Sequence, residues 1–379
     1  MTEPLLVRIG LRTLRGFAEK GRPAAGADAI HLLNAEERKT LRRIERGAIV
    51  RAAIAGALSS LVAAVVELEI ARPLLGARPR YATFGEQARF YAVVGAATVI
   101  ASAIEIGFLY WDGLRSVHRL AHEAGLDLFP ETEDDDRAIA TAMARAALEL
   151  PNPNASVFGV NPRREASRLR LLVASLVYKA KISVTNFMMK MLVRRMLGRA
   201  AVRSWLPFVA VPFTALWNAY ICRRIMHEAR IRAMGPSAAK ELVGFALAMH
   251  EGTPSDEALA CTVRAVASSI VRTEDLHPNL VALFRDLAGR EARTDDDVDD
   301  TRTFLARLAA LALADQTLVL RVLSIASVID GRLTKNERRL LTEARTACGK
   351  DADLAAVEAL RAAFVAGDPL PPSLVTALA

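Results

Sequence analysis

Three carboxylates lie at the ends of long apolar runs in this 379-residue chain. Glu67 and Glu69 follow the first run, and Glu105 follows the second. A carboxylate is costly inside a bilayer, so at such a position it marks either a path for ions or protons or a buried ion pair. The two apolar runs must therefore be placed before the carboxylates can be given a role.

The apolar runs at 52–66 and 90–104 each contain fifteen uncharged residues. A helix needs about 20 residues to cross a bilayer, so each run reaches that length only by including its carboxylates. Pro73 and Gly76 lie in the linker between the runs and favour a turn. The sequence therefore predicts a transmembrane helical hairpin over 49–112, and the alternative is a buried helix pair in a large soluble bundle.

The spacing of charges favours structural ion pairs in this hairpin. Glu67 lies sixteen residues after Arg51, and Glu105 lies sixteen residues after Arg89, which is about 24 Å along each helix. Antiparallel helices then place Glu67 and Glu105 near opposite ends, which excludes a carboxylate pair at mid-membrane. We expect Glu105 to pair with Arg51, and Glu67 or Glu69 to pair with Arg89 or Arg72. The alternative is a small-solute or ion-handling protein that uses Glu67, Glu69 and Glu105.

The composition indicates an all-α chain with a basic middle and an acidic tail. Hydrophobic residues make up 52% of the chain and aromatic residues only 6%, and Leu and Ala are frequent. Residues 166–232 carry thirteen Lys and Arg against one acid, whereas residues 237–379 carry sixteen Lys and Arg against twenty-one acids. These opposite charges predict different surroundings for the two segments.

Arginines flanking the hairpin predict its orientation. Six lie before the first run or after the second: Arg42, Arg43, Arg46, Arg51, Arg115 and Arg119. Three lie in the connecting turn: Arg78, Arg80 and Arg89. The positive-inside rule then places both termini in the cytoplasm, at a bacterial inner membrane.

Five parts are expected along the chain. They are a basic cytoplasmic N-terminal segment at 1–48, the transmembrane hairpin at 49–112, polar helices and a loop at 113–165, basic amphipathic and re-entrant membrane-associated helices at 166–235, and an acidic cytoplasmic helical domain at 236–379.

Residues 166–197 predict one long helix with a narrow polar stripe. Lys179, Lys190 and Arg194 fall on this stripe, and most of the remaining circumference is apolar. Such a helix fits a membrane surface that contains anionic lipid, and it also fits a bundle in which the stripe faces water. Both interpretations stay open.

The segment "SWLPFVAVPFTALWNAYIC" at 204–222 is a third apolar run. Pro207 and Pro212 predict that it is broken and re-entrant, because proline removes helix hydrogen bonds. Trp205 and Trp217 are expected to contact the membrane interface, where tryptophan is enriched. This segment with its basic flanks resembles the hydrophobic hairpin of EcsC-like bacterial proteins, although Ala210 replaces their usual glycine. The resemblance implies membrane association and no defined chemistry.

The acidic tail predicts a helical domain. Its expected helices are 237–251, 255–271, 278–289, 299–313, 315–329, 334–348 and 351–366. In "VIDGRLTKNE", Asp330 and Gly331 end one helix, and Thr334 with Glu337 form a capping box that begins the next.

This turn resembles the one in TerB-like helical domains, known from tellurite-resistance and DnaJ-type membrane proteins. The resemblance implies a helical bundle over about 301–366 and names Asp330 and Glu337 as candidate ligands of a divalent metal. A calcium-binding EF-hand is excluded, because Ala326 and Val328 stand where that loop needs oxygen ligands. A glycine turn with a helix cap, and no cofactor, is the simpler interpretation.

Other chemistry finds no support in the sequence. No glycine-rich phosphate loop, nucleophile elbow or dinucleotide-binding fingerprint is present, and no nucleic-acid-binding motif accompanies the basic middle. His118 and His122 share a helix face, but no third metal ligand is evident. We therefore expect a non-enzymatic membrane protein that presents a TerB-like domain as a scaffold or adaptor in an envelope or stress response. Its protein partner and its oligomeric state stay open, and a soluble lipid- or partner-binding bundle is a further alternative.

Overall fold

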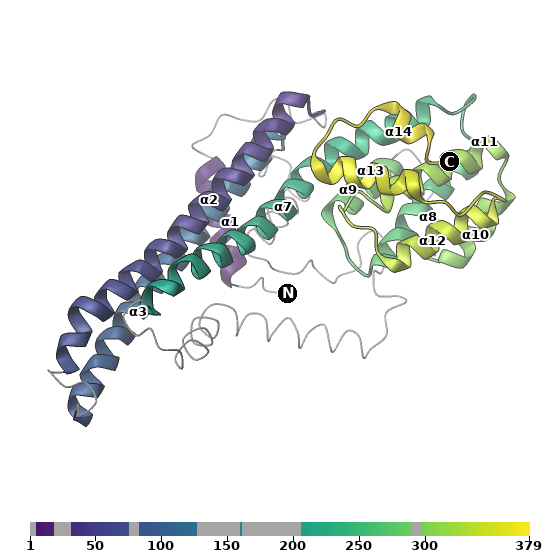
Figure 1. Cartoon of the computed structure of the whole chain (residues 1–379). Helices are drawn as coiled ribbons and strands as arrows, with labels where there is room; N and C mark the ends of the chain where they lie inside the picture. Colours follow the sequence, from purple (N-terminus) through teal and green to yellow (C-terminus); the bar gives the residue numbers. More distant parts are fainter. Residues whose placement is uncertain (1–4, 19–31, 76–82, 127–159, 161–205, 290–297) are drawn as a thin grey trace. The chain divides into compact units, whose positions relative to one another are not determined.

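The computed structural model describes the chain except for residues 1–4, 19–31, 76–82, 127–159, 161–205 and 290–297 (Figure 1). Within the described residues the regular structure is entirely helical, with eleven α-helices and no strand, which confirms the all-α prediction. The α-helices are α1 (Leu5–Ala18), α2 (Ala35–Val65), α3 (Phe84–Glu123), α7 (Leu206–Ala248), α8 (Asp256–Thr273), α9 (Pro278–Ala288), α10 (Thr301–Ala310), α11 (Leu313–Ala326), α12 (Lys335–Ala347), α13 (Ala355–Ala366) and α14 (Pro372–Thr376).

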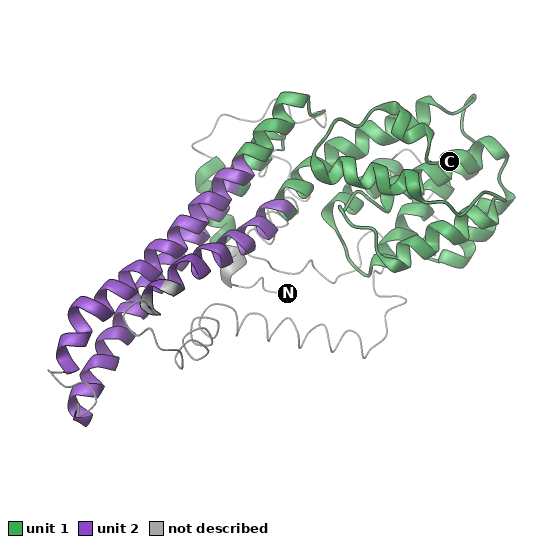
Figure 2. Ribbon diagram, viewed as in Figure 1, with its two compact units in different colours: residues 1–43, 117–167, 228–379 green, residues 44–116, 168–227 purple. Residues whose placement is uncertain are grey.

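The chain forms two compact units (Figure 2). Unit 1 contains Met1–Arg43, Val117–Ser167 and Glu228–Ala379, and unit 2 contains Ile44–Ser116 and Arg168–His227. Helix α7 contributes its first half to unit 2 and its second half to unit 1, so the expected boundary at 235/236 falls inside this helix.

Helices α2 and α3 are longer than the predicted spans. The side chain of Asn34 accepts a hydrogen bond from the amide of Glu37, and the Glu37 carboxylate accepts one from the amide of Asn34, so α2 begins at a capping box. A π-helical segment, Val66–Ala71, and a short 3-10 helix, Arg72–Leu75, continue α2.

Ala35–Leu75 and Phe84–Glu123 are long and apolar enough to cross a membrane, by length and composition. In the most apolar part of each segment, only 28% and 11% of the residues respectively are buried inside the structure. These two segments therefore expose most of their apolar surface.

Helix α7 corrects the expectation of a broken, re-entrant segment. It runs without interruption for 43 residues, through Pro207, Pro212 and Pro236. Pro207 lies in the first helical turn, where the backbone N–H has no intrahelical partner. Pro212 and Pro236 each remove one backbone bond, and the bonds of the neighbouring residues keep the helix continuous. The expected separate helix at 237–251 is thus the second half of α7.

The helices of the acidic tail follow the sequence prediction closely, and α8 lies at their centre. Contacts from α8 extend to α9, α10, α11 and α12, and its residues from Cys261 to Val271 are all buried. Aromatic and branched side chains of the surrounding helices complete the core: Phe304, Phe364, Leu280, Leu308, Leu323 and Leu340 are at most 1% exposed. Side-chain caps at Ser255, His277, Asp300 and Thr334 start α8, α9, α10 and α12.

Candidate functional site

The predicted glycine turn and capping box are present at the start of α12. The Thr334 hydroxyl accepts a hydrogen bond from the amide of Glu337, and a Glu337 carboxylate oxygen accepts one from the amide of Thr334 at 2.8 Å. Gly331 has φ +80°, a conformation that favours glycine, and an added Cβ would lie 2.4 Å from Ile231 Cδ1. The backbone conformation therefore favours glycine here, and any larger residue would also have to displace the Ile231 side chain.

Asp330 and Glu337 are both buried beneath this turn. Asp330 Oδ1 accepts a hydrogen bond from the amide of Arg332, and Glu337 accepts one from the hydroxyl of Ser269 on α8. Burial raises the pKa of Asp330. Burial, together with the nearby Asp330 carboxylate, raises the pKa of Glu337 to about 8. At neutral pH the Glu337 carboxyl therefore keeps its proton for most of the time.

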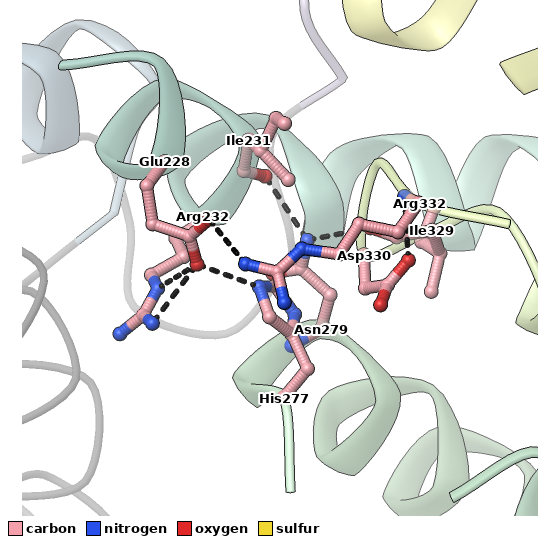
Figure 3. Close-up of polar contacts among 8 residues, drawn as sticks. All are labelled: Glu228, Ile231, Arg232, His277, Asn279, Ile329, Asp330 and Arg332. Atoms are coloured by element: carbon pink, nitrogen blue, oxygen red, sulfur yellow. Dashed lines mark hydrogen bonds and ion pairs between the residues drawn. The ribbon is translucent and has the colours of Figure 1, made fainter. Parts of the chain in front are cut away.

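Glu228, near the middle of α7, is the centre of an ion-pair cluster with three cationic or protonatable side chains (Figure 3). Its Oε1 lies 2.9 Å from Arg232 Nη2 and 3.3 Å from His277 Nε2, and its Oε2 lies 3.4 Å from Arg332 Nη2. Burial opposes ionisation of Glu228, but the contact with His277 and the charges of Arg232 and Arg332 outweigh it and hold its pKa well below the usual range. Glu228 is thus an ionised carboxylate that ties together three segments of unit 1.

The bonds around His277 define its tautomer. His277 Nδ1 accepts the backbone N–H of Asn279 at 3.3 Å and so caps α9. In the neutral ring the proton must then be on Nε2, which faces Glu228. The side chain is 1% exposed, so this arrangement is held inside the unit.

Asn279 makes a second link between the same segments. Its Nδ2 donates to the carbonyl of Ile231 on α7 at 3.0 Å and to the carbonyl of Ile329, in the turn that follows α11, at 2.8 Å (Figure 3). A Cβ at Gly235 would lie 2.0 Å from Asn279 Cγ, so the glycine allows this side chain to approach α7. The Gly-Pro sequence in α7 therefore serves close packing rather than a helix end.

The arrangement in unit 1 fits a structural charge network. The carboxyl groups of Glu228, Asp330 and Glu337 are contacted by cations, backbone amides or a hydroxyl. Among the described residues, no group of three or more His, Cys, Asp or Glu side chains could hold a metal ion. The proposal that Asp330 and Glu337 bind a divalent metal stays a prediction.

In unit 2, the buried carboxylate of Glu105 has an amide partner on α7. Asn218 Nδ2 donates to Glu105 Oε1 at 2.7 Å, and the two residues are 6% and 5% exposed. Next to them, the hydroxyls of Ser60 and Thr214 are 2.6 Å apart, and Thr214 also donates to the carbonyl of Gly56. A polar seam, defined here as these five residues, thus joins α7 to both α2 and α3.

Arg51 has a different partner from the one expected. Its Nε donates to Asp112 Oδ1 at 2.8 Å and its Nη2 to Ser116 Oγ at 3.0 Å, so the predicted Arg51–Glu105 pair is corrected to Arg51–Asp112. Asp112 lies two helical turns beyond Glu105. The sequence estimate assumed that Arg51 and Arg89 mark the ends of equal helices, whereas Arg51 lies in the interior of the 31-residue α2.

The remaining predicted residues are placed as follows. Glu67 is partly buried and Glu69 is exposed, both in the π-helical segment, and Arg89 is exposed near the start of α3. Their expected pairing stays a prediction. Trp217 is partly buried on α7 beside Tyr220, with ring centroids 6.1 Å apart. The other expected membrane contacts, Lys179, Lys190, Arg194 and Trp205, lie outside the described residues.

Sequence reasoning missed the Glu228 cluster. Glu228 is the single acid within the basic segment 166–232, and this isolation was the available signal. Its partners His277 and Arg332 lie far away in the sequence, so no local pattern could join them.

Comparison with family models, curated proteins and solved structures gives no match to this chain.

Proposed function

We propose that this chain is a non-enzymatic bacterial inner-membrane protein, anchored by the α2–α3 hairpin, that presents a helical domain to the cytoplasm as a scaffold or adaptor. The envelope or a stress response is the setting that fits the TerB-like resemblance. Each element of this proposal has its own support.

The exposed apolar surface of α2 and α3 is the observation that carries the anchor. The core helix of a soluble protein is mostly buried, whereas here large apolar side chains face outward. These include Ile54, Leu58, Val62, Tyr91, Val99, Ile100 and Ile104, each between 52% and 69% exposed. Exposing apolar area to water costs about 25 cal/mol per Å², so this surface favours a lipid environment.

The orientation is supported by charge. The positive-inside rule favours the cytoplasm for the helix ends that carry the most arginine, which are the start of α2 and the end of α3. The beginning of α2 and the end of α3 both belong to unit 1. A cytoplasmic unit 1 is the arrangement most consistent with these facts.

The adaptor role is supported by the nature of unit 1. Its buried charges hold helices together, as in the Glu228 cluster. The TerB-like resemblance of 301–366 and the EcsC-like resemblance around α7 both fit a membrane-linked helical protein. Neither resemblance implies an enzymatic reaction.

Ion handling is a second candidate, supported by the burial of Glu105 among apolar helices. Proteoliposomes that contain a pH-sensitive dye distinguish it from an anchor. The anchor proposal expects the same dye response from the natural chain and from Glu105→Gln. A proton or ion flux that Glu105→Gln abolishes would favour ion handling instead.

The proposed orientation is tested with a C-terminal tag and protease added to intact spheroplasts. The expected result is a tag that is protected until the cells are lysed, with the same result for an N-terminal tag. A cytoplasmic soluble protein serves as the lysis control. Digestion of either tag in intact spheroplasts would overturn the proposed topology.

A further inference from the structure

The first half of α7, from Leu206 to Cys222, lies along the hairpin (Figure 1), and the polar seam joins them. Asn218 binds Glu105 on α3, and Thr214 binds Ser60 and the Gly56 carbonyl on α2. Gly56 makes the approach close, because an added Cβ would lie 2.7 Å from the Thr214 carbonyl oxygen. Three helices therefore share one polar interior.

The contacts give the direction of α7. Thr214 lies beside Ser60, and Asn218, four residues later, lies beside Gly56, four residues earlier on α2. Helix α7 is therefore antiparallel to α2, and its first residues lie toward the turn of the hairpin. Eight residues separate Leu206 from Thr214, so α7 begins about 12 Å closer to that turn than the Ser60 contact.

The opposite side of α7 is apolar and exposed. Phe213, Leu216 and Tyr220 are spaced three and four residues apart, which places them on one helix face, and they are 37%, 72% and 52% exposed. Thr214 and Asn218 share the other face and are 5% and 6% exposed. Polar groups inside and apolar groups outside are the distribution expected of a helix packed in lipid.

From these observations we infer that Leu206–Cys222 is a third membrane-embedded helix, with lipid acyl chains against the face of Phe213, Leu216 and Tyr220. This inference rests on the proposed membrane anchor and adds to the two segments that length and composition identify. Seventeen residues span about 25 Å, close to the thickness of the hydrocarbon core. Two arginines precede the segment and two follow it, so flanking charge does not favour either orientation in the membrane. The contacts of the polar seam determine the orientation instead.

The hydrogen bonds of the seam explain why the segment stays in place although it contains Asn218 and Thr214. Every one of these side chains has a bonding partner on a neighbouring helix, so none faces lipid. Pro212 is tolerated in such a helix, because the bonds of its neighbours maintain the backbone.

Tryptophan fluorescence in vesicles of acyl-chain-brominated phospholipid tests the inference on the full chain. Trp111, Trp205 and Trp217 are first replaced by Phe. Single tryptophans are then introduced as Leu216→Trp on α7 and as two matched exposed positions, Ile100→Trp on α3 and Leu313→Trp on α11. These three side chains are 72%, 60% and 68% exposed, so a difference in quenching reports whether lipid or water surrounds them.

The expected result is that brominated lipid quenches Leu216→Trp as strongly as Ile100→Trp and leaves Leu313→Trp unchanged. Quenching of Ile100→Trp without quenching of Leu216→Trp would overturn the third helix and leave the anchor standing. Absence of quenching at Ile100→Trp would overturn the anchor itself. If Leu216→Trp does not fold, judged by circular dichroism, Tyr220→Trp gives the same comparison from the same helix face.

Discussion

Units 1 and 2 distribute apolar side chains in opposite ways. In unit 1, the core consists of residues such as Phe304 and Phe364, both 0% exposed. Among the exposed large apolar side chains of the described residues, unit 1 contributes Ile9, Leu32 and Leu313, and all the others belong to unit 2. The interior of unit 2 instead contains the polar seam.

This difference is the one expected from the proposed surroundings, water for unit 1 and lipid for unit 2. Water drives apolar side chains inward, and lipid removes that drive, so helices in lipid are held by close packing and hydrogen bonds. In both units the central buried carboxylates have partners, as a buried polar group needs. Glu228 is held by ion pairs, whereas Glu105 in the polar seam is held by the amide of Asn218.

The largest expected effect contrasts a buried and an exposed apolar residue. Phe364→Ala should destabilise unit 1 by about 3–5 kcal/mol, because it leaves a cavity in the core. Ile104→Ala, at a 69% exposed position of α3, should change the stability of unit 2 by less than about 0.5 kcal/mol. Amide hydrogen exchange of α12 and of α3 in a lipid nanodisc measures both. Equal losses in both units would contradict the proposed difference in their interiors.

A glycine-to-alanine substitution in each unit tests one position where two helices pack closely. Gly235→Ala should cost about 1–3 kcal/mol, because its Cβ overlaps Asn279, and Gly56→Ala a similar amount, because its Cβ overlaps a backbone carbonyl of α7. Thermal unfolding by circular dichroism measures the losses.

Two other helix glycines are matched controls. Gly244 and Gly95 have no heavy atom within 4 Å of an added Cβ. Alanine at these positions should stabilise the helices by up to about 1 kcal/mol, since it has the higher helix propensity. A loss of stability at Gly244 or Gly95 equal to that at Gly235 or Gly56 would show that packing is not the cause.

The pH dependence of unit 1 tests the buried carboxyl of Glu337. Its pKa is about 8 in the folded chain and 4.5 without the fold, so the folded state holds the proton more tightly. The contribution to stability is full below about pH 4.5 and is lost as the pH rises toward about 8. Within this window the slope reaches at most about 1.4 kcal/mol per pH unit.

Urea unfolding at several pH values measures this slope. Glu337→Gln should flatten it, because glutamine keeps the cap and carries no charge. Asp330→Asn should lower the pKa of Glu337 and move the slope to lower pH, since it removes the nearby charge. A slope unchanged in Glu337→Gln would refute the assignment.

The smallest expected effect is the coupling of Arg51 to Asp112. A double-mutant cycle of Arg51→Gln and Asp112→Asn should show a coupling energy of about 0.5–3 kcal/mol, because the two side chains are bonded. The cycle of Arg51→Gln with Glu105→Gln should be close to additive. Thermal stability in detergent is the measurement, and the reverse order of the two couplings would restore the pairing expected from sequence.

Local patterns predicted much of this molecule. The tail helices after α7, the cap at Thr334 and the turn at Gly331 depend on residues within a few positions of each other, and these predictions are confirmed. The two long apolar helices were also recognised from their composition.

Long-range pairing could not be predicted in the same way. The partner of Arg51 depends on the relative register of two helices, and the partner of Glu105 lies on α7, more than one hundred residues away. Proline misled the interpretation of α7, because its cost depends on the position in the helix and on the packing that holds the helix together. The Glu228 cluster joins three separate segments and had no local signature.

An alkaline-carbonate wash of the membrane fraction shows whether the α2–α3 hairpin is embedded in lipid. An embedded hairpin keeps the full chain in the membrane pellet, beside an integral membrane protein as a control. Release into the supernatant, together with a peripheral control protein, would contradict it. In that case the exposed apolar faces of α2 and α3 would have to be covered by protein instead of lipid.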